Sequence, residues 1–282
     1  MENYQAQLFP YAYNILGSAE EAKDAIQDVL LKYTQKGVVA NHEKNYLIKG
    51  VVNQSINRKR DLKKLVQHEG WLPEPVTTEG AEVGAERRDM ATYAMLHLLE
   101  KLNPKERAVF ILKEAFAYTH DEVAEVLSIT VEHSRKLLSR AHGKLHTSSR
   151  PKQLPQPPQL AIARQHKQLD AYIQAIQARD LNALHAMLAN DIVFRADGGK
   201  RIKVVATHAQ GAQAVAELLL YTYHTFQTQF TRQLGVVNHQ PAILYYYKHQ
   251  LKVCQVFQLN AITQQVMSVS TIVDPDKLKH IV

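Results

Sequence analysis

The 282-residue sequence has one cysteine, no long apolar run and no cluster of residues at metal-ligand spacing. Cys254 cannot form an internal disulfide, so we expect a reducing compartment. The most apolar stretch, residues 214–221, is much too short to cross a bilayer, and no N-terminal segment is typical of a signal peptide. We therefore expect a soluble, cytoplasmic protein with no metal site and no cofactor.

Positive charge is distributed unevenly along the chain, whose net charge is +7. Residues 1–150 carry 21 Lys and Arg against 20 Asp and Glu, whereas residues 151–282 carry 13 against 7. The first part is polarised locally, with basic stretches at 49–64 and 135–144. Such runs are either solvated faces or nucleic-acid-binding surfaces, and charge alone leaves both interpretations open.

Two stretches lack helical periodicity and divide the chain. Residues 67–86 are rich in Gly, Pro, Thr and Glu, and residues 148–159 contain four prolines, which favour an extended spacer over a helix. The sequence therefore predicts two linkers and three folded pieces, which are residues 1–66, 87–147 and 160–282.

The first two pieces have the pattern of helical domains, and the third mixes helices with strands. Ser18 and Glu21 form a capping box in front of apolar residues at helical spacing. Pro104 is placed to start a further helix. In the third piece, helical patterns at 160–178, 180–189 and 211–224 are mixed with β-rich runs at 242–247, 252–259 and 266–273. This mixture is typical of an α+β domain.

A helix-turn-helix is predicted over residues 119–145. Thr119 and Glu122 form a second capping box, Ser128 begins a tight turn, and Thr130 is a suitable N-cap for the next helix. That helix would bury one apolar face and present the other to a DNA major groove. An ordinary helical hairpin with a basic solvent face has the same pattern. The residues expected to contact DNA are Thr130, Glu132, His133, Arg135, Lys136 and Arg140.

The order of motifs in residues 1–147 resembles that of the sigma-70 family. Residues 96–110, with Leu96, Leu99, Leu102, Pro104, Glu106-Arg107 and Val109-Phe110, look like the start of a σ4 domain that continues into the helix-turn-helix. Residues 13–28 look like the σ2 core, and residues 45–60 resemble the helix that opens the −10 element. Because no σ3-like domain lies between them, the chain is similar to the extracytoplasmic-function class.

This resemblance implies core RNA polymerase, through its β′ and β subunits, and promoter DNA as partners. An exposed row of acidic residues next to a leucine would suit docking on the β′ coiled coil. This row consists of Asp24, Gln27, Asp28 and Leu31. In the −10 segment, cations would hold phosphates and amides would bind extruded bases, which gives Lys49, Asn53, Asn57, Arg58 and Arg60. Asn57 stands where the family usually has Asp, so a promoter preference does not carry over.

The third piece resembles SnoaL-like, nuclear-transport-factor-2-like cones, in which helices pack on a curved sheet around a pocket. The resemblance rests on the order of elements and on residues 172–194. Three short motifs connect it with sigma factors that have a SnoaL-like extension. The residues expected to act in regulation or interdomain contact are Trp71, Pro73 and Glu74, then Asp197, Gly198, Gly199 and Lys200, then Asp274, Pro275, Asp276, Lys277 and Leu278.

Each of these motifs departs from the family pattern or has a second interpretation. The Asp197 motif lacks one of the usual three glycines and would also suit a plain hairpin turn. The motif at 274–278 begins with Asp where Asn is common, and is either a terminal turn or a latch across domains. Trp71 beside prolines is best interpreted as an anchor that docks on another domain.

The predicted fold is multidomain, with two all-α sigma domains followed by an α+β cone. We expect a transcription initiation factor, not an enzyme, that reads a −35 element with residues 130–140 and melts a −10 element with residues 46–60. It would be regulated in cis by residues 160–282, with no separate anti-sigma factor and no membrane attachment.

Two alternatives remain. One is a one-component helix-turn-helix regulator whose C-terminal pocket binds a small molecule. The other is an enzyme with DNA-binding appendages, because related cones use a pocket carboxylate as general base. Candidate polar groups for such chemistry are Asp191, His208, Tyr223, His224 and the run Tyr245, Tyr246 and Tyr247.

Overall fold

The computed structural model of the chain describes residues 2–36, 43–65, 70–78, 89–146 and 159–281. The chain forms two compact units. Unit 1 comprises Met1–Gln67 and Ala81–Leu154, and unit 2 comprises His68–Gly80 and Pro155–Val282. The described part of the first predicted linker, residues 70–78, therefore packs with the C-terminal domain.

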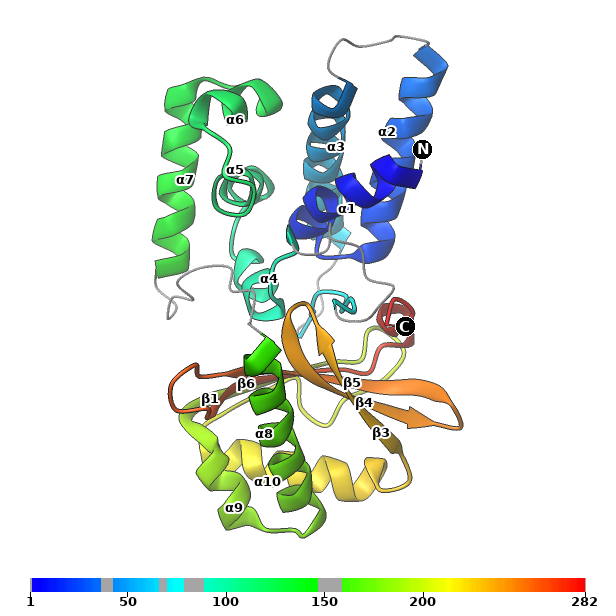
Figure 1. Cartoon of the computed structure of the whole chain (residues 1–282), viewed down its shortest axis with the longest axis vertical. Helices are drawn as coiled ribbons and strands as arrows, with labels where there is room; N and C mark the ends of the chain where they lie inside the picture. Colours follow the sequence, from blue (N-terminus) through cyan, green and yellow to red (C-terminus); the bar gives the residue numbers. More distant parts are fainter. Residues whose placement is uncertain (1, 37–42, 66–69, 79–88, 147–158, 282) are drawn as a thin grey trace. The chain divides into compact units, whose positions relative to one another are not determined.

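The described residues of unit 1 form helices, as the sequence predicted (Figure 1). These are α1 (Glu2–Leu16), α2 (Ala19–Lys36), α3 (Glu43–Leu65), α4 (Tyr93–Leu99), α5 (Pro104–Glu114), α6 (His120–Leu127) and α7 (Val131–His146). The hydroxyl of Ser18 accepts a hydrogen bond from the Glu21 amide at 3.1 Å, so the predicted cap of α2 forms. Pro104 begins α5 behind the capping residue Asn103, also as expected.

Helices α1, α2 and α3 share one apolar core, and α5 and α6 pack against these helices. Apolar residues of α2 at helical spacing, including Ala22, Ile26 and Val29, are buried in this core. α3 contacts both α5 and α6, so the two predicted sigma domains form a single unit (Figure 1).

Unit 2 is an α+β domain built on one six-stranded sheet. Its helices are α8 (Gln159–Gln177), α9 (Leu181–Met187), α10 (Ala212–Thr222), the π-helical turn η2 (Tyr223–Gln227) and α11 (Pro275–Leu278). Its strands are β1 (Leu188–Asp197), β2 (His208–Gln210), β3 (Thr231–Val237), β4 (Gln240–Tyr247), β5 (Gln250–Leu259) and β6 (Val266–Ile272). The strand order is β2-β1-β6-β5-β4-β3, and only the β1–β6 pair is parallel.

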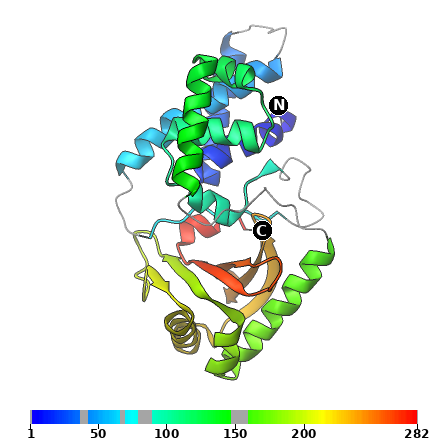
Figure 2. The same ribbon diagram turned by 90° about the vertical axis from the view of Figure 1, so that its left-hand side faces the viewer.

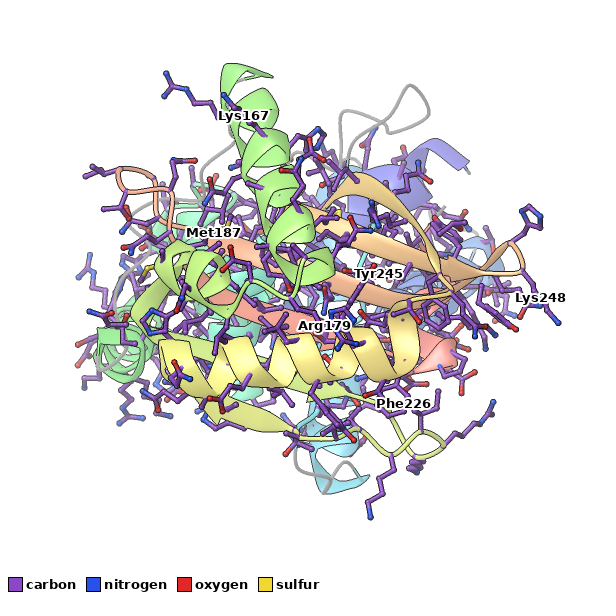
Figure 3. All side chains as sticks on the ribbon, turned by 90° about the horizontal axis from the view of Figure 1, so that it is seen from below. Lys167, Arg179, Met187, Phe226, Tyr245 and Lys248 are labelled. Carbon is purple, nitrogen blue, oxygen red and sulfur yellow. The ribbon has the colours of Figure 1, made fainter. Side chains whose placement is uncertain are left out.

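Helices α8, α9 and α10 lie across the sheet, and their apolar faces form the core of unit 2 (Figures 2 and 3). Tyr172 of α8 packs edge-on against Phe257 of β5, with 5.0 Å between ring centroids. α10 lies against β1 and α8 against β4, so both helices meet the same sheet. The predicted cone is therefore confirmed.

Candidate functional site

The helix-turn-helix forms with the predicted caps. The Thr119 hydroxyl accepts from the Glu122 amide at 3.2 Å, and the Glu122 carboxylate accepts from the Thr119 amide at 2.6 Å. Ser128 ends α6 in the left-handed conformation, with a φ of 51°. Thr130 then caps α7, because its hydroxyl accepts from the His133 amide at 3.1 Å.

The solvent face of α7 carries the residues expected to contact DNA. Ser134, Leu137 and Ala141 are buried against the rest of unit 1. The exposed residues include all six predicted ones, Thr130, Glu132, His133, Arg135, Lys136 and Arg140. Lys136 pairs with Glu132 at 2.6 Å along the helix surface, which adds little stability at such exposure. The face is therefore basic and open to solvent.

The predicted polymerase-docking row lies on α2. Gln27 is exposed, and Leu31 is an unusual exposed apolar residue with 51% of its surface accessible. The two acids of the row do not stand alone. Arg58 of α3 reaches across to Asp24 at 3.5 Å and to Asp28 at 3.9 Å. Thus a residue expected to hold DNA phosphates instead partly neutralises the row.

Arg58 makes further contacts with the start of α2. Its guanidinium lies 3.3 Å from the Glu21 carboxylate and donates to the Glu21 carbonyl at 3.2 Å. Beside it, the Gln54 amide donates to Asp28 at 3.1 Å. Arg58 and Asp28, which the sequence assigned to separate binding surfaces, thus help to hold α3 against α2.

The other predicted −10 residues divide between internal and exposed positions. The Asn53 amide donates to the Lys49 carbonyl at 2.8 Å and to the Val126 carbonyl of α6 at 2.9 Å. Asn57 and Arg60 are exposed, 3.5 Å apart between amide oxygen and guanidinium. Asn53 is therefore engaged in holding α3 to α6, whereas Asn57 and Arg60 are accessible.

A buried charge cluster joins α3 to the segment between α4 and α5. Lys59 is 4% exposed and donates to Glu100 at 2.9 Å and to the Leu16 carbonyl at 2.7 Å. Arg107, fully buried, pairs with the same carboxylate and donates to the Asn14 carbonyl at 2.8 Å. Sequence reasoning counted Lys59 only as part of a basic stretch and missed this cluster, because its members are far apart in the chain.

Burial and neighbouring charge shift the pKa values of this cluster. Burial, and then the Arg107 charge, lower the pKa of Lys59 to about 7, although Glu100 partly opposes this. Burial by itself would raise the pKa of Glu100. The charges of Arg107 and Lys59 outweigh that effect and lower the Glu100 pKa to about 2. The carboxylate is thus held ionised between two cations.

In unit 2, the three short motifs meet at the carboxylate of Asp197. This buried side chain accepts from the Leu72 amide at 2.7 Å, from the Gly199 amide at 2.8 Å and from the Lys277 ammonium at 2.6 Å. Lys277 also donates to the Leu72 carbonyl and lies 4.5 Å from the centre of the Trp71 ring. We call these five residues the Asp197 junction.

Steric contacts and hydrogen bonds restrict which residues can stand next to the Asp197 junction. A Cβ atom at Gly198 would lie 1.9 Å from the Ile202 carbonyl oxygen, so only glycine fits that position. Asp274 caps α11 by accepting from the Asp276 amide at 3.1 Å, and Asp276 pairs with Arg201 at 3.3 Å. The other predicted residues are Pro73 and Leu278, which are buried, Glu74, which is half-buried, and Lys200 and Pro275, which are exposed.

Segment 70–78 is anchored to unit 2 at a second place, next to the edge strand β3. The Val76 amide donates to the Asn238 side chain at 3.0 Å, and the Asn238 amide donates to the Val76 carbonyl at 2.9 Å. Thr77 forms a β-bridge with Val237. The segment thus satisfies backbone groups that an edge strand leaves unpaired.

A cavity opens on one face of the sheet of unit 2. Of the candidate polar groups for catalysis, Tyr247 lines it, whereas Asp191, His208, Tyr223, His224, Tyr245 and Tyr246 do not. Among the described residues, no Asp, Glu or His lines the cavity. The described lining therefore lacks a carboxylate of the kind that related cones use as general base.

The described ranges contain neither a metal-binding group of side chains nor a membrane-spanning helix. Within these ranges, no three His, Cys, Asp or Glu side chains are grouped so as to hold a metal ion. No helix there is long and apolar enough to cross a membrane.

Known proteins resemble the chain in sequence and in fold. Residues 93–145, from α4 to α7, match the family Sigma-70, region 4. The chain is 26% identical to the ECF RNA polymerase sigma factor SigJ of Mycobacterium tuberculosis over 78% of this chain and 70% of SigJ. It is 24% identical to the probable ECF RNA polymerase sigma factor SigI of that organism, over 98% of this chain and 92% of SigI.

The fold similarity extends along both units. The crystal structure of the Mycobacterium tuberculosis extracytoplasmic function sigma factor SigJ aligns with a TM-score of 0.77 at 23% identity. The alignment covers 99% of this chain and 97% of that one. The helical unit and the cone therefore occur in the same order in both proteins.

Proposed function

We propose that this chain is an extracytoplasmic-function sigma factor of the sigma-70 family with a SnoaL-like C-terminal domain, and that it binds core RNA polymerase in the cytoplasm and directs transcription initiation at specific promoters. The observation that carries this proposal is the capped α7 helix within the region-4 match, whose solvent face presents Arg135 and Arg140. Arginine and polar residues on such a helix can read base edges and hold phosphates.

In vitro transcription with core polymerase, followed by start-site mapping, tests the proposal. The chain should direct initiation at promoters that share a −35 and a −10 element. Failure to be retained on core polymerase, together with DNA binding by the free chain, would favour a one-component regulator instead.

Asp24, Asp28 and Leu31 are proposed to dock on the polymerase. Changing Asp24 and Asp28 to Lys should weaken retention on core polymerase, because the row would change sign while its helix stays solvent-exposed. The matched control is Glu125→Lys, an exposed acid on α6. Equal retention of both variants would remove the row from the interface.

For the Asn53 amide to donate to a base, it must leave the Val126 carbonyl, which removes a contact between α3 and α6. The compact unit 1 is therefore proposed to be the form that is not engaged with promoter DNA. Cysteines introduced at Asp61 and Glu125, both exposed, can carry fluorophores because the native Cys254 is buried. Energy transfer between them should fall when core polymerase binds, and unchanged transfer would contradict this proposal.

Unit 2 is proposed to regulate the sigma domains in cis, in place of a separate anti-sigma factor. Segment 70–78 belongs to the connection between the two sigma domains, yet the Asp197 junction and the Asn238 contact tether it to the cone. Contacts in cis act at high effective concentration, so modest interactions suffice. Proteolysis of the 66–86 region should be faster when Asp197 is changed to Asn than in the native chain.

A further inference from the structure

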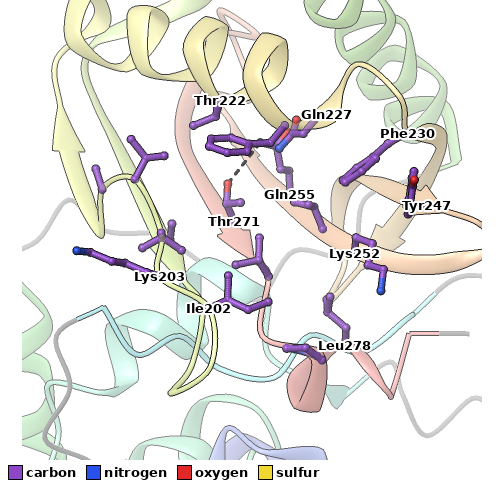
Figure 4. Close-up of a pocket in the computed structure, with 18 of the residues that line it drawn as sticks. Ile202, Lys203, Thr222, Gln227, Phe230, Tyr247, Lys252, Gln255, Thr271 and Leu278 are labelled. Atoms are coloured by element: carbon purple, nitrogen blue, oxygen red, sulfur yellow. Dashed lines mark hydrogen bonds between the residues drawn. The ribbon is translucent and has the colours of Figure 1, made fainter.

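The cavity of unit 2 has a volume of about 560 Å³, within the range of small-molecule sites (Figure 4). One wall of the cavity is formed by β1, β5 and β6. The opposite wall is formed by the end of α10 and by η2, and residues 202–206 and α11 complete the lining. Most of the lining is apolar, with Phe194, Phe230 and Val253 among its residues. Such a cavity favours an apolar occupant.

The charged and polar groups in the lining indicate which kinds of ligand the cavity can bind. The charged lining residues are Lys203 and Lys252, which are both exposed. Because no acidic residue faces them, a cationic ligand would find no counter-charge there. The deeper polar groups are neutral amides and hydroxyls, so the walls suit a neutral molecule with hydrogen-bonding capacity.

Gln255 on β5 provides the most specific feature. It is 2% exposed and lies beside Thr271 on the neighbouring strand, to which its amide nitrogen donates at 3.4 Å. Its amide oxygen is buried and accepts no hydrogen bond from any described residue. By contrast, the Thr222 hydroxyl on the opposite wall already donates to the Leu218 carbonyl at 2.9 Å. The orphaned Gln255 oxygen is an acceptor that lacks a donor.

We propose that this cavity binds a largely apolar, uncharged small molecule whose hydroxyl group donates to the Gln255 amide oxygen. The hydroxyl satisfies the unpaired acceptor, and the apolar body fills the space between α10 and the sheet. The described lining has no carboxylate or imidazole, so the assigned role is binding. The inference concerns the cone alone and does not depend on the sigma-factor role.

The occupied cavity would contact the Asp197 junction through one helix. Pro275 and Leu278 of α11 line the cavity, and Lys277 between them holds Asp197 and lies over Trp71. Trp71 is the sole tryptophan of the chain, so its fluorescence reports directly on the position of α11. A ligand that moves α11 would therefore also act on segment 70–78.

The test compares 1-decanol with methyl nonyl ether, which has the same number of heavy atoms but no donor. Isothermal titration calorimetry of the full chain should show decanol binding at least about tenfold more tightly, because a polar site discriminates strongly against a ligand that leaves it unpaired. Decanol should also change the Trp71 emission. Equal affinities for the two compounds, or no binding of decanol, would overturn the proposal.

Two variants locate the effect. Gln255→Met is close in shape but lacks the acceptor, so the preference for decanol over the ether should disappear. Gln258→Leu is the matched control on the same strand, because Gln258 accepts from Ser268 and does not line the cavity. It should keep the preference, and loss of the preference in both variants would also overturn the assignment of Gln255. The wild-type comparison stands even if a variant folds poorly.

Discussion

Glu100 lies between two buried cations, Lys59 and Arg107. Its negative charge offsets the cost of burying them. Changing Glu100 to Gln removes the counter-charge of both at once. Breaking a buried ion pair in this way destabilises a protein by roughly 3–5 kcal/mol. Urea denaturation followed by helical circular dichroism should show this loss for E100Q. The control Glu125→Gln, at an exposed position, should change the free energy of unfolding by about 0.5 kcal/mol or less.

The lowered pKa of Lys59 predicts that the free energy of unfolding rises with pH. Its pKa is about 7 in the folded chain, below its ordinary value of 10.5, so between these limits the unfolded chain binds more protons. The free energy of unfolding should therefore rise with pH from about 7 upward, by at most about 1.4 kcal/mol per pH unit from this group. Below pH 7 this contribution is lost, because Lys59 is charged in both states.

The variant Lys59→Met isolates this effect. Arg107 still pairs with Glu100 in that variant, so the carboxylate keeps a buried partner. The difference between wild-type and K59M stabilities should change steadily from pH 7 to pH 9, whereas other groups cancel in the comparison. A constant difference across that window would show that Lys59 does not titrate there.

At the scale of elements, α7 carries the prediction for DNA recognition. Arg135→Ala and Arg140→Ala should each weaken binding to −35-containing promoter DNA by roughly 1–3 kcal/mol if the side chain makes a bidentate base contact. Fluorescence anisotropy with the polymerase-bound protein would measure this. Loss of an arginine that holds a phosphate should instead lower the salt dependence of binding.

Lys105 provides the control for α7. It is an exposed cation on α5, outside the helix-turn-helix, so Lys105→Ala removes the same charge from unit 1 at a different place. It should leave promoter affinity nearly unchanged. If both arginine variants behaved like the lysine variant, α7 would not be the recognition helix.

At the scale of the whole molecule, the cone and its tail should have separable effects on transcription. Removing residues 274–282 takes away Lys277, whose ammonium lies 2.6 Å from the Asp197 carboxylate. Removing residues 160–282 takes away Asp197, Asn238 and Lys277, which hold segment 70–78 in the described structure. We therefore expect the full deletion to change transcription strongly and the tail deletion to have a different effect.

The comparison requires equal amounts of each protein in a reconstituted transcription assay. Asp197→Asn in the intact chain should shift activity in the same direction as the tail deletion, since both weaken the Asp197 junction. If all these proteins transcribed alike, the cone would not regulate the sigma domains.

The local sequence by itself determined the helical elements and their caps. Ser18, Thr119 and Thr130 act within three residues of their own helices, and apolar spacing marks the buried face of α2 without help from distant contacts. The strands at 242–247 and 266–273 were found in the same way, because alternation and β-branched residues are local signals. The motifs at Trp71, Asp197 and Asp274 were also visible as motifs.

Only the tertiary structure decided how these pieces are used. Asp197 and Lys277 are separated by 80 residues, and Lys59 and Glu100 by 41, so no spacing rule brings either pair together. The contacts of Arg58 also depend on the fold. Its charge predicted a contact with a DNA phosphate, but its neighbours are acidic residues of α2. A buried acceptor such as the Gln255 oxygen is defined by what surrounds it, because burial and hydrogen bonding belong to the folded chain rather than to any residue type.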